Sequence, residues 1–100
     1  MQLPPIKGIV ALHSVVRLGS ISKAAEELNL TVSAVSHQLS TLESFVNQKL
    51  LERSSKGVTL TIYGERFHRE ISGALTLISA AAQNLRSGET DEVLRIHAVP

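Results

Sequence analysis

The stretch from Ser20 to Glu43, SISKAAEELNLTVSAVSHQLSTLE, constrains the fold of this chain more than any other. Its apolar residues recur three or four positions apart, the spacing at which side chains share one face of a helix. Asn29 falls between the two apolar sets, and asparagine tolerates the left-handed backbone of a tight turn. The stretch therefore predicts two short helices packed together across a turn. The residues expected to face inward are Ala24, Ala25, Leu28, Leu30, Val35 and Leu39.

Capping residues set the expected helix boundaries. Gly19, Asn29 and Asn47 suit the left-handed residue that ends a helix, and Ser20 and Thr31 can each cap the helix that follows. These signals predict helices over residues 6–18, 21–28 and 32–46. The inward face of the third helix is expected to comprise Val35, Leu39, Leu42, Phe45 and Val46.

The outward face of the third helix is short-chained and lacks acidic residues. It carries Val32, Ser33, Ser36, His37 and Ser40. Such a helix can enter the major groove of duplex DNA, which is about 12 Å wide, and acidic side chains there would repel phosphate. An ordinary solvated surface is the alternative, but it would be expected to carry more lysine and glutamate.

Two strand-like runs follow, Leu50–Arg53 and Gly57–Leu60, joined by Ser54-Ser55-Lys56. They predict a short β-hairpin, which would be marginal alone. Thr61 can then cap a helix from about Ile62 to Arg86. A heptad seam along that helix comprises Phe67, Ile71, Ala74, Ile78, Ala81 and Leu85.

Heptad spacing is typical of two helices that pair along their length. The alternative is that the seam packs on its own domain, but a helix of this length spans roughly 37 Å, more than so small a domain covers. We therefore expect a homodimer.

The stretch from Ser20 to Glu43, followed by L-L-E-R at 50–53 and G-V-T-L-T at 57–61, resembles the N-terminal domain of LysR-type bacterial transcriptional regulators. L-P-P at 3–5 and A-V-S-H-Q at 34–38 resemble the subgroup that includes the glycine-cleavage activator. The resemblance implies a mainly α fold: a winged helix-turn-helix of three helices and a β-hairpin wing over residues 1–61, then a linker and dimerisation helix over 62–88. It also implies that residues 89–100, with a strand at Val93–Val99, begin an effector-binding domain beyond this chain, where a small-molecule effector would bind.

With the resemblance, the hypothesis is a homodimer that binds a palindromic site in double-stranded DNA and regulates transcription. The expected base contacts are Val32, Ser33, Ser36 and His37, and the expected backbone contacts are Ser22, Lys23, Thr31, Arg53 and Lys56. The family often has glutamine at the position of Val32, where valine offers at most contact with a thymine methyl group. An alternative for four of these residues is an ordinary solvated surface position without DNA contact: His37, Lys23, Arg53 and Lys56.

Charge is unevenly distributed along the chain. Residues 1–86 hold nine Lys or Arg and six Asp or Glu, whereas residues 87–100 hold one and three. This modest basic excess predicts affinity from a few contacts made twice rather than from a broad positive field. The absence of cysteine, of a signal peptide and of a run long enough to span a bilayer predicts a cytoplasmic protein without membrane contact.

Other functions find less support in the sequence. Ser36 and His37 are adjacent, so they diverge on a helix, and no acid is placed to orient the histidine for catalysis. The four histidines show no metal-binding spacing, and no cofactor is expected. Asn29-Leu30-Thr31 matches a glycosylation sequon but is better explained by turn and cap chemistry. The remaining rival is a helical protein-interaction module that acts through the long helix.

Overall fold

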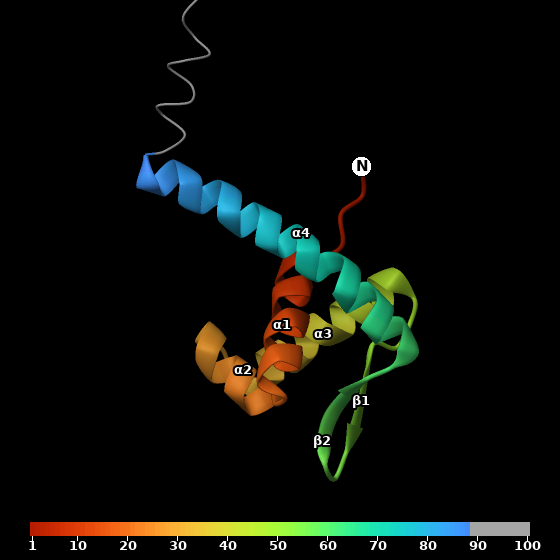
Figure 1. Ribbon diagram of the computed structural model, residues 1–100. Coiled ribbons are helices and arrows are strands. Elements are labelled where there is room, and N and C mark those ends of the chain that lie inside the picture. Colours follow the sequence, from red (N-terminus) through yellow and green to blue (C-terminus); the bar gives the residue numbers. More distant parts are fainter. Residues whose placement is uncertain (89–100) are drawn as a thin grey trace, which may run out of the picture. The chain divides into compact units, whose positions relative to one another are not determined.

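The computed structural model describes residues 1–88, in which four helices and two strands follow one another (Figure 1). They are α1 (Ile6–Leu18), α2 (Ile21–Leu28), α3 (Val32–Val46), β1 (Leu51–Ser54), β2 (Gly57–Leu60) and α4 (Ile62–Ser87). The strands form an antiparallel hairpin that pairs Leu51 with Leu60 and Ser54 with Gly57. This architecture confirms the predicted fold class. The strand predicted at Val93–Val99 lies outside the described residues.

Residues 1–70 form one compact unit, and residues from 71 onward form a second. In the first unit, α1 and α3 supply most of the largest fully buried side chains: Leu12, Val15, Val35, Leu42 and, before the hairpin, Leu50. Helix α1 approaches α3 closely at Gly8, where an added Cβ atom would lie 2.8 Å from the Gln38 carbonyl oxygen. Glycine at this position therefore sets the distance between the two helices.

The helix caps confirm the predicted boundaries. Backbone N–H groups of Lys23 and Ala34 donate to the hydroxyls of Ser20 and Thr31, at 3.2 and 3.0 Å. Asn29 and Asn47 adopt φ angles of 56° and 55°, the left-handed conformation expected of them. The hydroxyl of Thr61 likewise accepts from the N–H of Gly64 at 3.0 Å.

Three local predictions were wrong. Leu30 is 37% exposed, because it lies in the turn, where helical spacing no longer applies. Phe45 is exposed too, since it lies about 100° round the helix from Val46, which is half-buried. Strand β1 begins at Leu51 rather than Leu50, and its first strand pair is Leu51 with Leu60.

Helix α4 changes character along its length. Gly64 is buried, and an added Cβ atom there would lie 2.0 Å from the carbonyl oxygen of Leu50. In residues 71–88, by contrast, no residue is buried, and Leu77 and Ile78 are 72% and 65% exposed. Within residues 1–88, none of the helices combines the length and apolar content that a membrane crossing requires.

Candidate nucleic-acid interface

Helices α2 and α3 form the helix-turn-helix that the sequence predicts. The turn is closed by the N–H of Leu30, which donates to the Ala25 carbonyl at 2.9 Å. Ala24, Ala25 and Val35 are buried between the helices and α1, and small side chains on α2 allow this close packing. The packing fixes which face of α3 is left outward.

The outward face of α3 carries the residues expected to contact bases. Val32 is 48% exposed, Ser33 and His37 are exposed, and Ser36 is half-buried. No acidic residue occurs from Val32 to Ser40. The helix thus presents short polar and apolar groups, which suit a base edge, and its N-terminal end, which favours anions.

The residues expected to contact the DNA backbone are all exposed: Ser22, Lys23, Thr31, Arg53 and Lys56. They come from α2, from the turn before α3 and from the hairpin after α3. In the sequence they therefore lie on both sides of α3. The Thr31 oxygen already accepts from Ala34, but its hydroxyl proton can still be donated to a phosphate.

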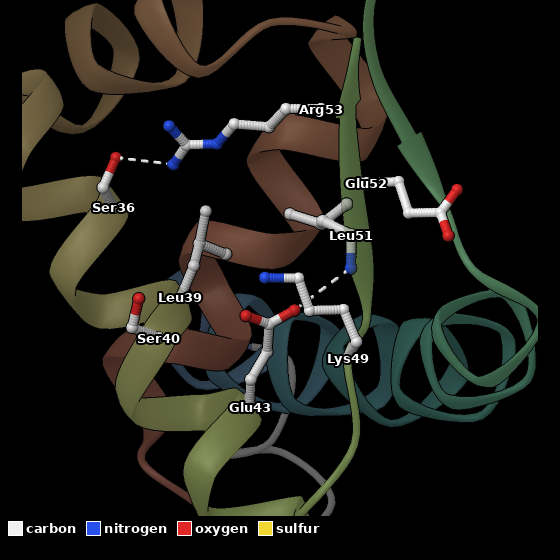
Figure 2. A pocket seen from close by; sticks show the side chains of 8 residues that line it. All are labelled: Ser36, Leu39, Ser40, Glu43, Lys49, Leu51, Glu52 and Arg53. Carbon is white, nitrogen blue, oxygen red and sulfur yellow. Dashed lines mark hydrogen bonds between the residues drawn. The ribbon is translucent and has the colours of Figure 1, made fainter.

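A hydrogen bond that the sequence did not reveal joins the hairpin to α3. The guanidinium of Arg53 on β1 donates through Nη2 to Oγ of Ser36 at 2.9 Å (Figure 2). Two residues predicted to contact DNA, 17 positions apart, are therefore in contact with each other. They line the groove between α3 and β1 that Figure 2 shows, together with Leu39, Ser40, Glu43 and others labelled there.

Glu43 fixes where the hairpin leaves α3. Its Oε2 accepts from the backbone N–H groups of Leu50 and Leu51, at 2.7 and 3.2 Å. A carboxylate that accepts two backbone N–H groups makes a strong anchor. No pattern in the sequence indicates this role, because the partners are seven and eight positions apart and a turn lies between them.

Glu27, one of the two acidic residues of α2, is bound by two side chains of α1. Ser14 of α1 donates to Glu27 at 2.7 Å, and the guanidinium of Arg17 binds the other carboxylate oxygen. The hydrogen bond from Ser14, together with Arg17, lowers the pKa of the Glu27 carboxyl. Its negative charge is therefore compensated within the fold.

A second pair of side chains joins α1 to the first turns of α4. Nδ1 of His13 lies 3.2 Å from Nε2 of His68, and the rings are stacked with centroids 5.3 Å apart. Burial lowers the pKa of His68, and the nearby His13 lowers it further. In residues 1–88, no three His, Cys, Asp or Glu side chains gather as a metal site would require.

The fold is that of a winged helix-turn-helix protein. It has two helices joined by a tight turn, a supporting helix, and a hairpin that begins beside the second helix. The chain belongs to the lysR family of bacterial regulatory helix-turn-helix proteins, whose family model matches residues 6–65. The resemblance inferred from the sequence is thereby confirmed.

Named relatives agree with this assignment. The chain is 35% identical over 95 residues to the glycine cleavage system transcriptional activator homolog of Haemophilus influenzae, covering 95% of this chain and 32% of the relative. It is 30% identical over 99 residues to the glycine cleavage system transcriptional activator of Escherichia coli K12, covering 99% and 32%. This chain therefore spans about a third of the length of these relatives.

A solved structure shares the fold. Full-length CbnR, crystallised in complex with its target DNA, superposes with a TM-score of 0.71 at 25% identity, covering 88% of this chain and 30% of CbnR.

Proposed function

We propose that this chain is the DNA-binding part of a bacterial transcriptional regulator, in which two copies bind a palindromic duplex site. Residues 1–61 would form the DNA-binding domain and residues 62–88 the linker and dimerisation helix. The assignment of residues 89–100 to an effector-binding domain stays a prediction. Such a protein would act in the bacterial cytoplasm as a regulator and not as an enzyme.

The observation that carries the proposal is the exposed, acid-free face of α3 beside a hairpin that bears Arg53 and Lys56. In this arrangement α3 lies in the major groove and contacts bases through Val32, Ser33, Ser36 and His37. Ser22, Lys23, Thr31, Arg53 and Lys56 contact the sugar-phosphate backbone. The proposal that this fold binds DNA is supported by CbnR, which shares the fold and is solved in complex with its target DNA.

Pairing through α4 would supply the second copy. The proposed interface comprises Phe67, Ile71, Ala74, Ile78, Ala81 and Leu85. Support comes from the heptad spacing and from exposure, since Ala74, Ile78, Ala81 and Leu85 are exposed. Exposed apolar residues at this spacing gain free energy when a second helix covers them.

The test is a fluorescence-anisotropy titration of a random duplex pool at two salt concentrations. Ser33→Glu introduces a negative charge on the outward face and should weaken binding at least about tenfold. Ser44→Glu is the matched control: it is exposed on the same side of α3, but it lies about 16 Å further along the helix, beyond the residues proposed to contact bases, so a much smaller change is expected. Equal effects of the two variants would contradict the proposed orientation of α3.

Binding of the unaltered protein decides between the two classes of function. Affinity that falls steeply with salt supports the DNA-binding proposal, and Lys56→Ala should lower the salt slope by about one. If the protein ignored every duplex in dilute buffer, the proposal would fail. The helical interaction module would then be the better description of the exposed face of α4.

A further inference from the structure

We infer that Arg53 is a positioning residue for Ser36, and that the pair selects a hydrogen-bond acceptor, guanine above all, at one base of the site. Arg53 would hold the Ser36 oxygen as acceptor, so that the hydroxyl proton points to the base. The inference rests on the proposed DNA-binding function. It adds a role for Arg53 beyond contact with phosphate.

The direction of the hydrogen bond is fixed by chemistry. A guanidinium is always protonated and has only donors, so Ser36 Oγ must accept from Arg53 Nη2 across their 2.9 Å contact. A hydroxyl has a single proton, which this contact leaves unused. The inner face of α3 packs on α1, so the hydroxyl proton of Ser36 is available on the side of α3 that faces the groove between α3 and β1. Figure 2 shows Ser36 and Ser40 on that side.

The position of the guanidinium is also fixed from the hairpin side. Glu43 holds the backbone of Leu50 and Leu51, two residues before Arg53, so β1 starts at a set distance from α3. Figure 2 shows the Arg53 side chain extending from β1 toward α3. Because Arg53 is already bonded to Ser36, less of its side chain has to be ordered on binding, which reduces the entropic cost of the contact.

The donor proton of Ser36 determines which base edges fit. In the major groove guanine offers two acceptors, N7 and O6, whereas cytosine offers the N4 amino donor. A hydroxyl that accepts from a cation is polarised, so it donates more strongly and accepts less well. The adjacent positive charge also favours the electronegative guanine edge and opposes the cytosine amino group.

The experiment selects bound duplexes from a random pool with the unaltered protein and with Ser36→Ala, Arg53→Ala, Arg53→Lys and Lys56→Ala. The unaltered protein should show a preference of about fivefold for guanine at one position of each half-site. Ser36→Ala and Arg53→Ala should both lose that preference, at the same position. Arg53→Lys, which can still donate to Ser36, should retain part of it.

Lys56→Ala is the matched control. Lys56 lies on the same hairpin and is exposed, but its backbone N–H donates to the Ser54 hydroxyl, within the hairpin itself. It should weaken binding to all sequences and leave the preference unchanged. Thermal unfolding of each variant checks that the fold is retained, and low salt restores enough affinity for selection.

Three outcomes would overturn the inference. Arg53→Ala that weakens all sequences uniformly would make Arg53 a phosphate contact alone. Ser36→Ala that keeps the unaltered preference would remove Ser36 from base recognition. A preference for cytosine at the affected position would reverse the assigned direction of donation. Failure of the proposed function looks different, because the unaltered protein would then retain no duplex at all.

Discussion

Residues 1–70 and residues 71–87 are both largely helical, but only the first region contains a core. In residues 1–70, the side chains of Leu12, Val35 and Leu42 are fully buried. In residues 71–87 no side chain is buried, and the large apolar residues Leu77, Ile78 and Leu85 are mostly exposed. The first region can fold on its own apolar contacts, whereas the second needs another surface to cover its apolar face.

The difference also appears in the glycines of α4. Gly64 lies against the backbone of Leu50, but an added Cβ atom at Gly73 would meet nothing within 4 Å. One helix therefore contains a glycine required by packing and another that packing does not explain. Three measurements test this contrast and two sharpen the description of the first region, in order from the largest expected effect to the smallest.

Leu42→Ala should reduce the free energy of unfolding by about 3 kcal/mol, because it opens a cavity in the fully buried core. Leu77→Ala should change it by less than about 0.5 kcal/mol, since that side chain is already in solvent. Urea denaturation of dilute protein measures both. Equal losses would mean that residues 71–87 have a core of their own.

Gly64→Ala and Gly73→Ala should have effects of opposite sign. The first places a methyl group against the Leu50 carbonyl and should cost about 2 kcal/mol. The second should stabilise α4 by up to about 1 kcal/mol, because alanine is the better helix former. Thermal unfolding compares them, and a stable Gly64→Ala variant would contradict the close approach of α4 to Leu50.

Ile78→Asp should weaken self-association by at least about tenfold, because a charge replaces an apolar side chain in the proposed dimer interface. Ser79→Asp, also exposed on α4 but outside the heptad seam, should leave the dimer intact. Sedimentation velocity over a range of concentrations distinguishes the two. A dimer that survives Ile78→Asp would place the interface elsewhere.

Thr31→Ala should cost about 1 kcal/mol of stability, because the N–H of Ala34 loses the hydroxyl that caps α3. Thr41→Ala on the same helix should cost little, since the Thr41 hydroxyl only donates to the His37 carbonyl one turn earlier. Chemical denaturation of both variants gives the comparison. A similar loss in both would assign the effect to the loss of threonine rather than to the cap.

The smallest effect concerns pH. Since the pKa of His68 is lowered in the fold, the unfolded chain binds more protons near the ordinary pKa of histidine, and the free energy of unfolding falls as the solution is acidified through that range. His68→Gln should make this fall shallower between about pH 7.5 and about pH 5.5. Thermal melts across the range measure it. An identical pH profile in the variant would show that the histidine pair does not contribute.

Local chemistry was sufficient to predict the helices. Ser20, Thr31 and Thr61 cap the helices that follow them, and Asn29 and Asn47 end the helices before them, because these roles involve only neighbours in the chain. The inward position predicted for Leu30 beside the turn is wrong, since this side chain is 37% exposed.

Contacts between distant residues could not be predicted in this way. Arg53 and Ser36 were each expected at the DNA, but their mutual hydrogen bond depends on where the hairpin leaves α3. That in turn depends on Glu43, whose carboxylate holds the backbone at Leu50 and Leu51. The spacing of residues along one helix does not contain this information.

The peptide groups around Leu50 have a mechanical consequence. The N–H of Leu50 is held by Glu43 of α3, and its carbonyl accepts the N–H of Thr61 at 3.0 Å, while the Thr61 hydroxyl donates to the Lys49 carbonyl at 2.6 Å. The start of the hairpin and the start of α4 are therefore both connected to α3 through hydrogen bonds at Lys49 and Leu50. A tilt at the start of α4 would carry the base of the hairpin with it.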